Sequence, residues 1–298
     1  MRRLDQPLAP IVVLRGARQV GKTTIQEQAI QHLLSERHVP RNRILRVQLD
    51  ELPSLRGVPD PILEIVRWFE NRVLGASLNE AAHAGAPAFL FFDEVQNLSD
   101  WAPQLKSLVD QSTVQVVVTG SSALRIEAGR DSLAGRIFTL ELGTLLLREI
   151  AGLRFGAEIE PLLPQNGLDR LLSIELWRAL NVADRDERAM VQRAFGAFSE
   201  RGGYPLVHAR PDAAWPEIAD QLNDTVVRRV IGHDLRMGER GRRRDPQLLE
   251  EAFRLACRYA GKRRAKRRCS RSYSVSSKQT SAGSGCVRTS SFWRAHSC

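Results

Sequence analysis

An octet near the amino terminus has the residue types and spacing of a phosphate-binding loop. Residues 16–23 read Gly-Ala-Arg-Gln-Val-Gly-Lys-Thr, a match to G-x-x-x-x-G-K-[ST]. Lys22 can place its ammonium between the β- and γ-phosphates of a nucleotide, and Thr23 offers a hydroxyl to Mg²⁺. The octet therefore predicts a site for ATP and Mg²⁺. The residues expected to contact the nucleotide are Gly16, Ala17, Arg18, Gln19, Val20, Gly21, Lys22, Thr23 and Thr24.

A pair of adjacent carboxylates is the second candidate for chemistry. Asp93 and Glu94 directly follow the apolar run at residues 88–92. In P-loop ATPases an Asp at the end of such a strand holds Mg²⁺. A neighbouring Glu is a suitable base to polarise the attacking water. The alternative is an ordinary surface turn, but the P-loop 70 residues upstream favours the catalytic interpretation.

Two further residues could assist at the γ-phosphate. Ser121 follows the apolar run at residues 114–119 and could sense the phosphate or the water, although Ser and Gly there also suit a plain turn. Arg136 precedes the run at 137–142 and could stabilise phosphate charge in cis, or in trans on a neighbouring subunit. The alternative for Arg136 is an ordinary surface arginine.

Alternating strands and helices must position these side chains. Apolar runs predict strands, and helical periodicity predicts helices between them. This alternation is typical of an α/β fold, with a mainly parallel sheet covered by helices on both faces. The predicted strands are 11–15, 44–49, 88–92, 114–119 and 137–142, and the predicted helices are 23–35, 60–82 and 101–110.

The character of the chain changes after this region. Strand signals fade between residues 144 and 261, and segments such as 174–180 and 218–230 have a helical pattern. We therefore expect a domain boundary near residues 144 to 170, with a loop at 161–167.

Five blocks of sequence resemble a group of prokaryotic AAA+ ATPases in which Arg-Gln precedes the second half of the P-loop. The blocks lie in the order and approximate spacing of that family, at residues 14–24, 92–98, 118–124, 133–136 and 202–205. The resemblance implies an ATP-binding AAA+ core of the P-loop NTPase class over residues 1–150. It also implies a helical region over 151–261 that leads into a truncated winged-helix-like domain. It supports the roles given to Ser121 and Arg136.

The chain departs from that family at two places. Ala17 stands where the family usually has Pro, and residues 145–149 lack the usual phenylalanine-containing stretch. Neither departure touches the phosphate chemistry.

Composition bounds the class of protein. The 298 residues, 43% of them hydrophobic, are enough for one large domain or two. No apolar run reaches the ~18 residues of a membrane span, and residues 1–7 lack an apolar secretion core. We therefore expect a cytoplasmic protein. The four cysteines form no C-x-x-C pair, so neither a zinc site nor a disulfide framework is supported.

The positive charge is concentrated in the tail. The formal net charge is +10, but residues 262–298 hold ten of the 44 Lys and Arg residues and none of the 34 acidic ones. The rest of the chain is therefore formally neutral. The tail has ten serines and no Leu or Ile, so it is expected to be disordered. One interpretation is a basic arm that binds nucleic acid.

A frameshift is a second interpretation of the tail. With GC-leaning codons, the DNA from Gln279 onward, read two bases later, can spell Asn-Ile-Gly-Trp-Gln-Arg-Val-Arg. The composition break motivates the hypothesis that residues from about 262 onward are out of frame. The basic charge would then be an artefact within a truncated second domain.

Two functions remain open at this point. The first is an AAA+ ATPase that couples hydrolysis of Mg-ATP to movement of its C-terminal region, with self-assembly into a homo-oligomer as a further expectation. The second is a nucleotide-gated module with little turnover, whose C-terminal region contacts DNA or a protein partner. A non-functional product of a damaged gene is a third interpretation.

Overall fold

A five-stranded parallel sheet forms the centre of the first half of the chain. The computed structural model describes residues 9–98, 100–120, 131–160, 173–180, 185–231 and 245–258. The strand order is β2-β3-β4-β1-β5, and every neighbouring pair is parallel. All the predicted strands are confirmed to within one residue at each end. They are β1 (Ile11–Gly16), β2 (Ile44–Gln48), β3 (Phe89–Asp93), β4 (Gln115–Gly120) and β5 (Ile137–Leu142).

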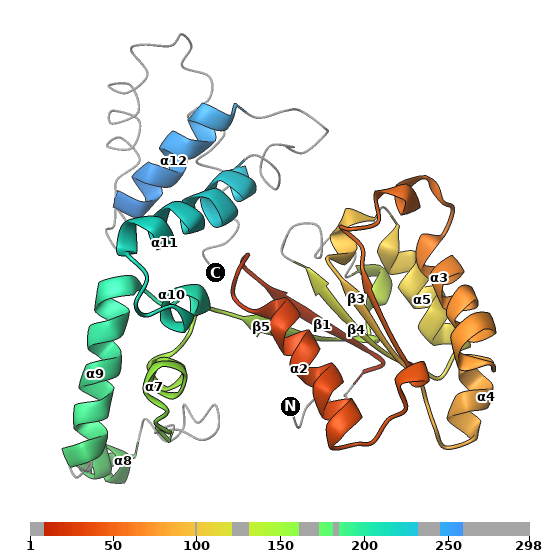
Figure 1. The fold of residues 1–298 in the computed structure, drawn as a ribbon, viewed down its shortest axis with the longest axis horizontal. Helices are drawn as coiled ribbons and strands as arrows, with labels where there is room; N and C mark the ends of the chain where they lie inside the picture. The colour runs from red at the N-terminus through yellow and green to blue at the C-terminus, as the bar shows by residue number, and fades with distance from the viewer. Residues whose placement is uncertain are drawn as a thin grey trace. The chain divides into compact units, whose positions relative to one another are not determined.

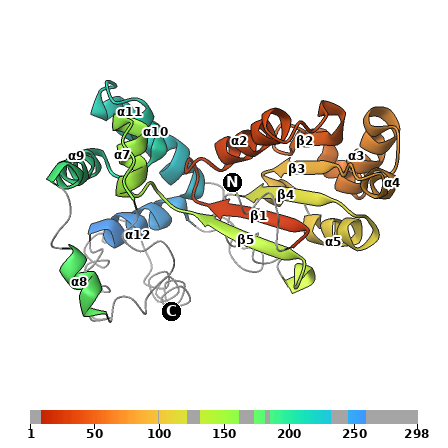
Figure 2. The same cartoon turned by 90° about the horizontal axis from the view of Figure 1, so that it is seen from below.

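Helices cover both faces of this sheet, as the alternation of elements predicts (Figures 1 and 2). The helix α2 (Lys22–Ser35) lies on one face, and α3 (Pro61–Phe69) and α5 (Trp101–Gln111) lie on the other. Successive strand residues point to opposite faces. Val12 and Leu14 accordingly pack in the α2 core, while Ile11 and Val13 pack in the core below α3 and α5. Burial on both faces explains why the strands read as continuous apolar runs.

The prediction of one continuous helix over 60–82 is wrong, because the structure divides this segment. The structure has α3, then a π-helical turn at Glu70–Leu74, and a separate α4 (Leu78–His83). The break occurs at Gly75, whose φ of 73° ends the first segment in the left-handed conformation. Ser77 and Glu80 then form a reciprocal capping box that starts α4.

The chain after β5 is helical in the parts that the structure describes. Its helices are α7 (Leu147–Phe155), α8 (Ile174–Leu180), α9 (Arg185–Arg201), α10 (Pro205–Ala209), α11 (Trp215–Leu222) and α12 (Pro246–Arg258). A π-helical stretch, Asn223–Arg228, continues α11, so the segment predicted at 218–230 is helical but not uniform. A small core around Ile150, Ala151, Ala194 and Ala197 joins α7 to α9.

The chain divides into two compact units, Met1–Gln221 and Leu222–Cys298. The change from strands to helices at residues 142–147, near the predicted domain boundary, lies within the first unit. The tail at 262–298 and the loop predicted at 161–167 lie outside the described residues. No helix in the described ranges is long and apolar enough to cross a membrane.

Candidate functional site

The P-loop joins the carboxyl end of β1 to the first turn of α2. Gly16 ends the strand, and a Cβ at this position would lie 2.3 Å from the carbonyl oxygen of Leu142 on the adjacent strand β5. Only glycine allows that approach of two backbones. Gly21 caps α2 with a φ of 94°, a conformation that side chains disfavour. Both glycines of the motif are therefore required by geometry.

Lys22 is held inside the loop that it is expected to serve. Its side chain is buried, and Nζ donates hydrogen bonds to the carbonyl oxygens of Gly16, at 3.0 Å, and Ala17, at 2.8 Å. Elsewhere in the loop Val20 is buried and anchors the turn, whereas Ala17, Gln19 and Thr24 are exposed and Arg18 is half-buried. The ammonium is thus held by the backbone of the loop whose N–H groups would surround a phosphate.

A hydrogen-bonded network joins the P-loop to the end of β3. Thr23 Oγ1 donates to Asp93 Oδ2 at 2.9 Å, and the hydroxyl of Thr119 donates to Asp93 Oδ1. Thr119 Oγ1 also accepts a hydrogen bond from the backbone N–H of Glu94 at 3.1 Å. Asp93 and Thr119 are buried, so both carboxylate oxygens of Asp93 are fixed in place. A threonine hydroxyl beside one fixed carboxylate fits Mg²⁺, which takes its remaining ligands from waters and substrate phosphates.

Glu94 lies at the edge of this network in an unusual backbone conformation. Its φ of 56° is in the left-handed region, which is uncommon for residues other than glycine. Such conformations cluster at functional sites. The side-chain amide of Gln96, itself buried, donates a hydrogen bond to Glu94 Oε2. The turn that follows β3 therefore orients the carboxylate of Glu94.

Sheet order brings these residues together. Strand β4 lies between β1 and β3, so Thr119 reaches the end of β3 while β1 delivers the P-loop. Ligands of open α/β sheets bind outside the carboxyl ends of the strands. Thr119 and Gln96 are site residues that the sequence reasoning missed. A signal for Thr119 existed, because it is a polar residue at the end of an apolar run, but its partner depended on the strand order.

Arg136 lies at the amino ends of the strands, whereas the P-loop follows the carboxyl end of β1. It directly precedes β5, and its carbonyl accepts a hydrogen bond from Ile11 N at the start of β1, at 3.1 Å. The carboxyl end of β5, Leu142, pairs with Gly16 of the P-loop. Six residues of strand separate the two positions, about 20 Å at 3.3 Å per residue. This separation places Arg136 far from the P-loop of its own chain.

Ser121, the other residue expected at the γ-phosphate, lies outside the described residues, which stop at Gly120 on that side and resume at 131. Its role stays a prediction.

A family comparison agrees with the fold of the first half of the chain. Residues 8–151 match the family model of the AAA domain. This part of the chain is an AAA-type P-loop domain. The matched range runs from before β1 into α7 and includes the P-loop, Asp93, Glu94 and Arg136. The P-loop, the parallel sheet and the family match together establish a domain of the nucleotide-binding AAA class.

Two individual proteins resemble the chain over longer ranges. An uncharacterized protein of Methanocaldococcus jannaschii is 26% identical over 251 residues, which are 82% of this chain and 47% of that protein. The chain thus spans about half the length of this curated relative. Among solved structures, C. elegans PCH-2 is similar with a TM-score of 0.40 and 14% identity, over 77% of this chain and 63% of that one.

Proposed function

We propose that the AAA domain hydrolyses Mg-ATP. The observation that carries this proposal is the contact of Thr23 with Asp93, which joins the P-loop to the acidic end of β3. Phosphoryl transfer in P-loop enzymes depends on positioning and on charge stabilisation rather than on covalent chemistry. A rigid network at the metal position supplies the first of these requirements.

Each residue of the site has a defined role in this proposal. Lys22 leaves the carbonyls of Gly16 and Ala17 and binds the β- and γ-phosphates. Thr23 and Asp93 would hold Mg²⁺, and the metal would supply neutralisation of the charge on the phosphate oxygens. Glu94 accepts a proton from the attacking water. Gln96 keeps the carboxylate of Glu94 oriented through its amide hydrogen bond.

Arg136 acts in trans, on nucleotide bound by a second copy of the chain. Its distance from its own P-loop supports this assignment. A guanidinium matches phosphate oxygens in a bidentate manner and stabilises charge in the transition state. The active enzyme is therefore a homo-oligomer, and turnover depends on the concentration of the protein.

Hydrolysis is coupled to the helical region through contacts that start at the P-loop. Gly16 lies against Leu142, and three residues later Leu145 N donates to the carbonyl of Gly203 at 2.7 Å. A Cβ on Gly203 would lie 3.0 Å from Thr144 Cβ. Tightly packed segments transmit small displacements. A shift of the P-loop on loss of the γ-phosphate would thus reach the turn before α10.

A nucleotide-gated module with little turnover is the second candidate. The observation in its favour is the distance between Arg136 and the P-loop of the same chain. A copy that does not assemble with others would lack Arg136 at its nucleotide and would turn over slowly. In this alternative ATP sets the conformation, and the C-terminal region contacts DNA or a protein partner.

Steady-state release of phosphate from ATP, with and without duplex DNA, separates the two candidates. The primary proposal expects turnover that rises with protein concentration. Glu94→Gln is expected to keep ATP binding and lose turnover by about 10²–10⁴-fold, whereas Lys22→Ala loses both. Unchanged turnover in Glu94→Gln would remove Glu94 from its role. Binding without turnover at any protein concentration would favour the gated module.

A further inference from the structure

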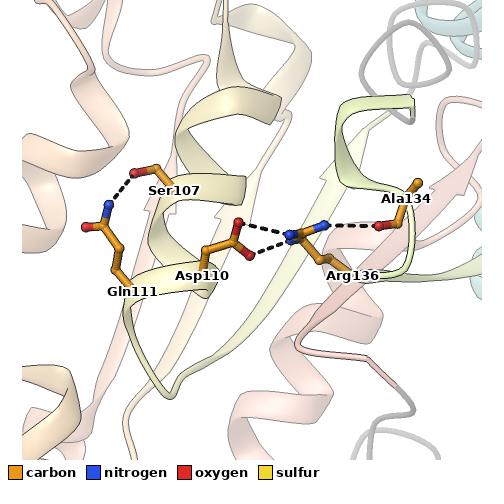
Figure 3. A network of polar contacts seen from close by, with 5 residues as sticks. All are labelled: Ser107, Asp110, Gln111, Ala134 and Arg136. Carbon is orange, nitrogen blue, oxygen red and sulfur yellow. Dashed lines mark hydrogen bonds and ion pairs between the residues drawn. The ribbon is translucent and has the colours of Figure 1, made fainter.

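The guanidinium of Arg136 is held in a fork by one carboxylate. Nε donates to Asp110 Oδ1 at 2.5 Å, and Nη2 donates to Asp110 Oδ2 at 3.0 Å (Figure 3). Nη1 donates to the carbonyl oxygen of Ala134 at 3.2 Å. A planar group with three such contacts on two sides has little rotational freedom.

The same geometry leaves part of the guanidinium free to bind. An arginine has five N–H groups in a fixed fork, and the contacts with Asp110 and Ala134 engage three of them. Within the described part of the chain the other two have no partner. They lie one on each Nη, and a guanidinium can donate N–H groups of both Nη atoms to two oxygens of a phosphate.

Helix stability does not explain an aspartate at this position. Asp110 is the second-last residue of α5, where the partial negative charge of the helix end disfavours a carboxylate. Both side chains of the pair are more than a third exposed, and exposed pairs contribute little to stability. The side-chain hydrogen bond from Arg136 is the main cause that lowers the pKa of Asp110.

We propose that Asp110 is a positioning residue, which fixes the plane of Arg136 so that its two free N–H groups are presented to nucleotide bound by a second copy of the chain. This inference rests on the proposed function, specifically on the role of Arg136 in trans. Asp110 touches neither substrate nor metal in this scheme. It acts by reducing the freedom that Arg136 would otherwise lose on binding.

The test is turnover by mixed subunits of the full chain. Lys22→Ala copies bind no ATP but carry an intact Arg136, and Arg136→Ala copies bind ATP but lack the arginine. Each alone is expected to be inactive, and the mixture is expected to recover phosphate release. Adding Asp110→Asn to the Lys22→Ala copy is expected to reduce that recovery by about 10- to 100-fold, since misplacement of about 1 Å can cost 10²-fold.

Three controls distinguish positioning from a structural role. Ser107→Ala removes a hydrogen bond to Gln111 on the same helix, without touching Arg136, and is expected to leave the recovery unchanged. Asp110→Glu keeps a carboxylate and is expected to restore part of the phosphate release that Asp110→Asn loses. As the only substitution in the full-length protein, Asp110→Asn is expected to lower kcat with little change in KM and in the midpoint of thermal unfolding.

The outcomes separate the two levels of the proposal. No recovery in the first mixture, or full turnover by Arg136→Ala alone, would overturn the role of Arg136 in trans. Recovery that is unchanged or increased by Asp110→Asn would leave the trans role intact and overturn the positioning role of Asp110.

Discussion

Thr23 donates its hydroxyl hydrogen to Asp93 Oδ2 across 70 residues of sequence, at 2.9 Å. Thr23 belongs to the first turn of α2 and Asp93 to the last position of β3. The bond therefore connects the segment that would bind phosphate to the segment that would bind the metal. Because Thr119 holds the other oxygen of Asp93, the position of the carboxylate is decided by three separate elements.

Thr119 offers the sharpest test of that network. Thr119→Val has nearly the same shape but leaves the backbone N–H of Glu94 and one oxygen of Asp93 without their partner. Unsatisfied buried groups cost about 1–3 kcal/mol, so chemical denaturation should show a fall of that size. The Mg²⁺ concentration needed for half-maximal turnover should rise about 10- to 100-fold, the usual effect of losing a residue that orients a metal ligand.

Thr119→Ser is the matched control, because it keeps the hydroxyl. It is expected to retain the Mg²⁺ requirement of the unchanged protein. An unchanged Mg²⁺ requirement in Thr119→Val would show that Asp93 needs no support from β4.

Gly203 tests the contact that links β5 to the helical region. It is buried, and a Cβ would lie 3.0 Å from Thr144 Cβ and 3.1 Å from the carbonyl oxygen of Leu145. Gly203→Ala is expected to destabilise the protein by about 1–3 kcal/mol, as overpacking does. If the contact also couples the two regions, the variant should bind ATP normally but hydrolyse it more slowly.

Gly196→Ala provides the opposite expectation for the same chemical change. Gly196 is an exposed residue away from the ends of α9, and a Cβ at this position would contact no other atom in the described part of the chain. Replacing a helical glycine by alanine is expected to raise the free energy of unfolding by about 0.5–1 kcal/mol. Equal effects of the two substitutions would contradict the close packing assigned to Gly203.

The burial of His208 leads us to expect a lower free energy of unfolding in mild acid. Its ring is buried, and Nε2 carries the hydrogen because the carbonyl oxygen of Gly202, 2.7 Å away, can only accept. Burial is the main cause that lowers the pKa of His208, and the charges of Arg154 and Arg201 lower it further. The unfolded chain therefore takes up a proton at a higher pH than the folded one. The contribution of the neutral ring to stability is complete above about pH 6.5 and is lost as the pH falls toward the folded-state pKa.

His208→Gln keeps a donor for Gly202 and removes the titration. Urea denaturation between pH 7.5 and 5 should show a steeper loss of stability for the unchanged protein than for this variant. Parallel curves would assign the acid sensitivity to other groups.

Local signals were enough for some parts of the fold and of the site. The apolar runs predicted each strand because both faces of a covered parallel sheet are buried, and the P-loop octet placed the turn between β1 and α2. The division of the helix predicted over 60–82 also had a local signal, namely Gly75 followed by the capping residues Ser77 and Glu80. The signal was overlooked because the helical spacing of apolar residues continues on both sides of Gly75.

The sequence by itself determined the class of chemistry, since the P-loop spacing and the pair Asp93-Glu94 depend on residue types within a few positions of one another. Only the tertiary structure decided which residues share a site. The order of the strands placed Thr119 beside Asp93, and the parallel pairing of β5 with β1 put Arg136 about 20 Å from its own P-loop. The physical reason is that strand order follows from how helices pack on the two faces of the sheet, a long-range property that no local pattern of residues encodes.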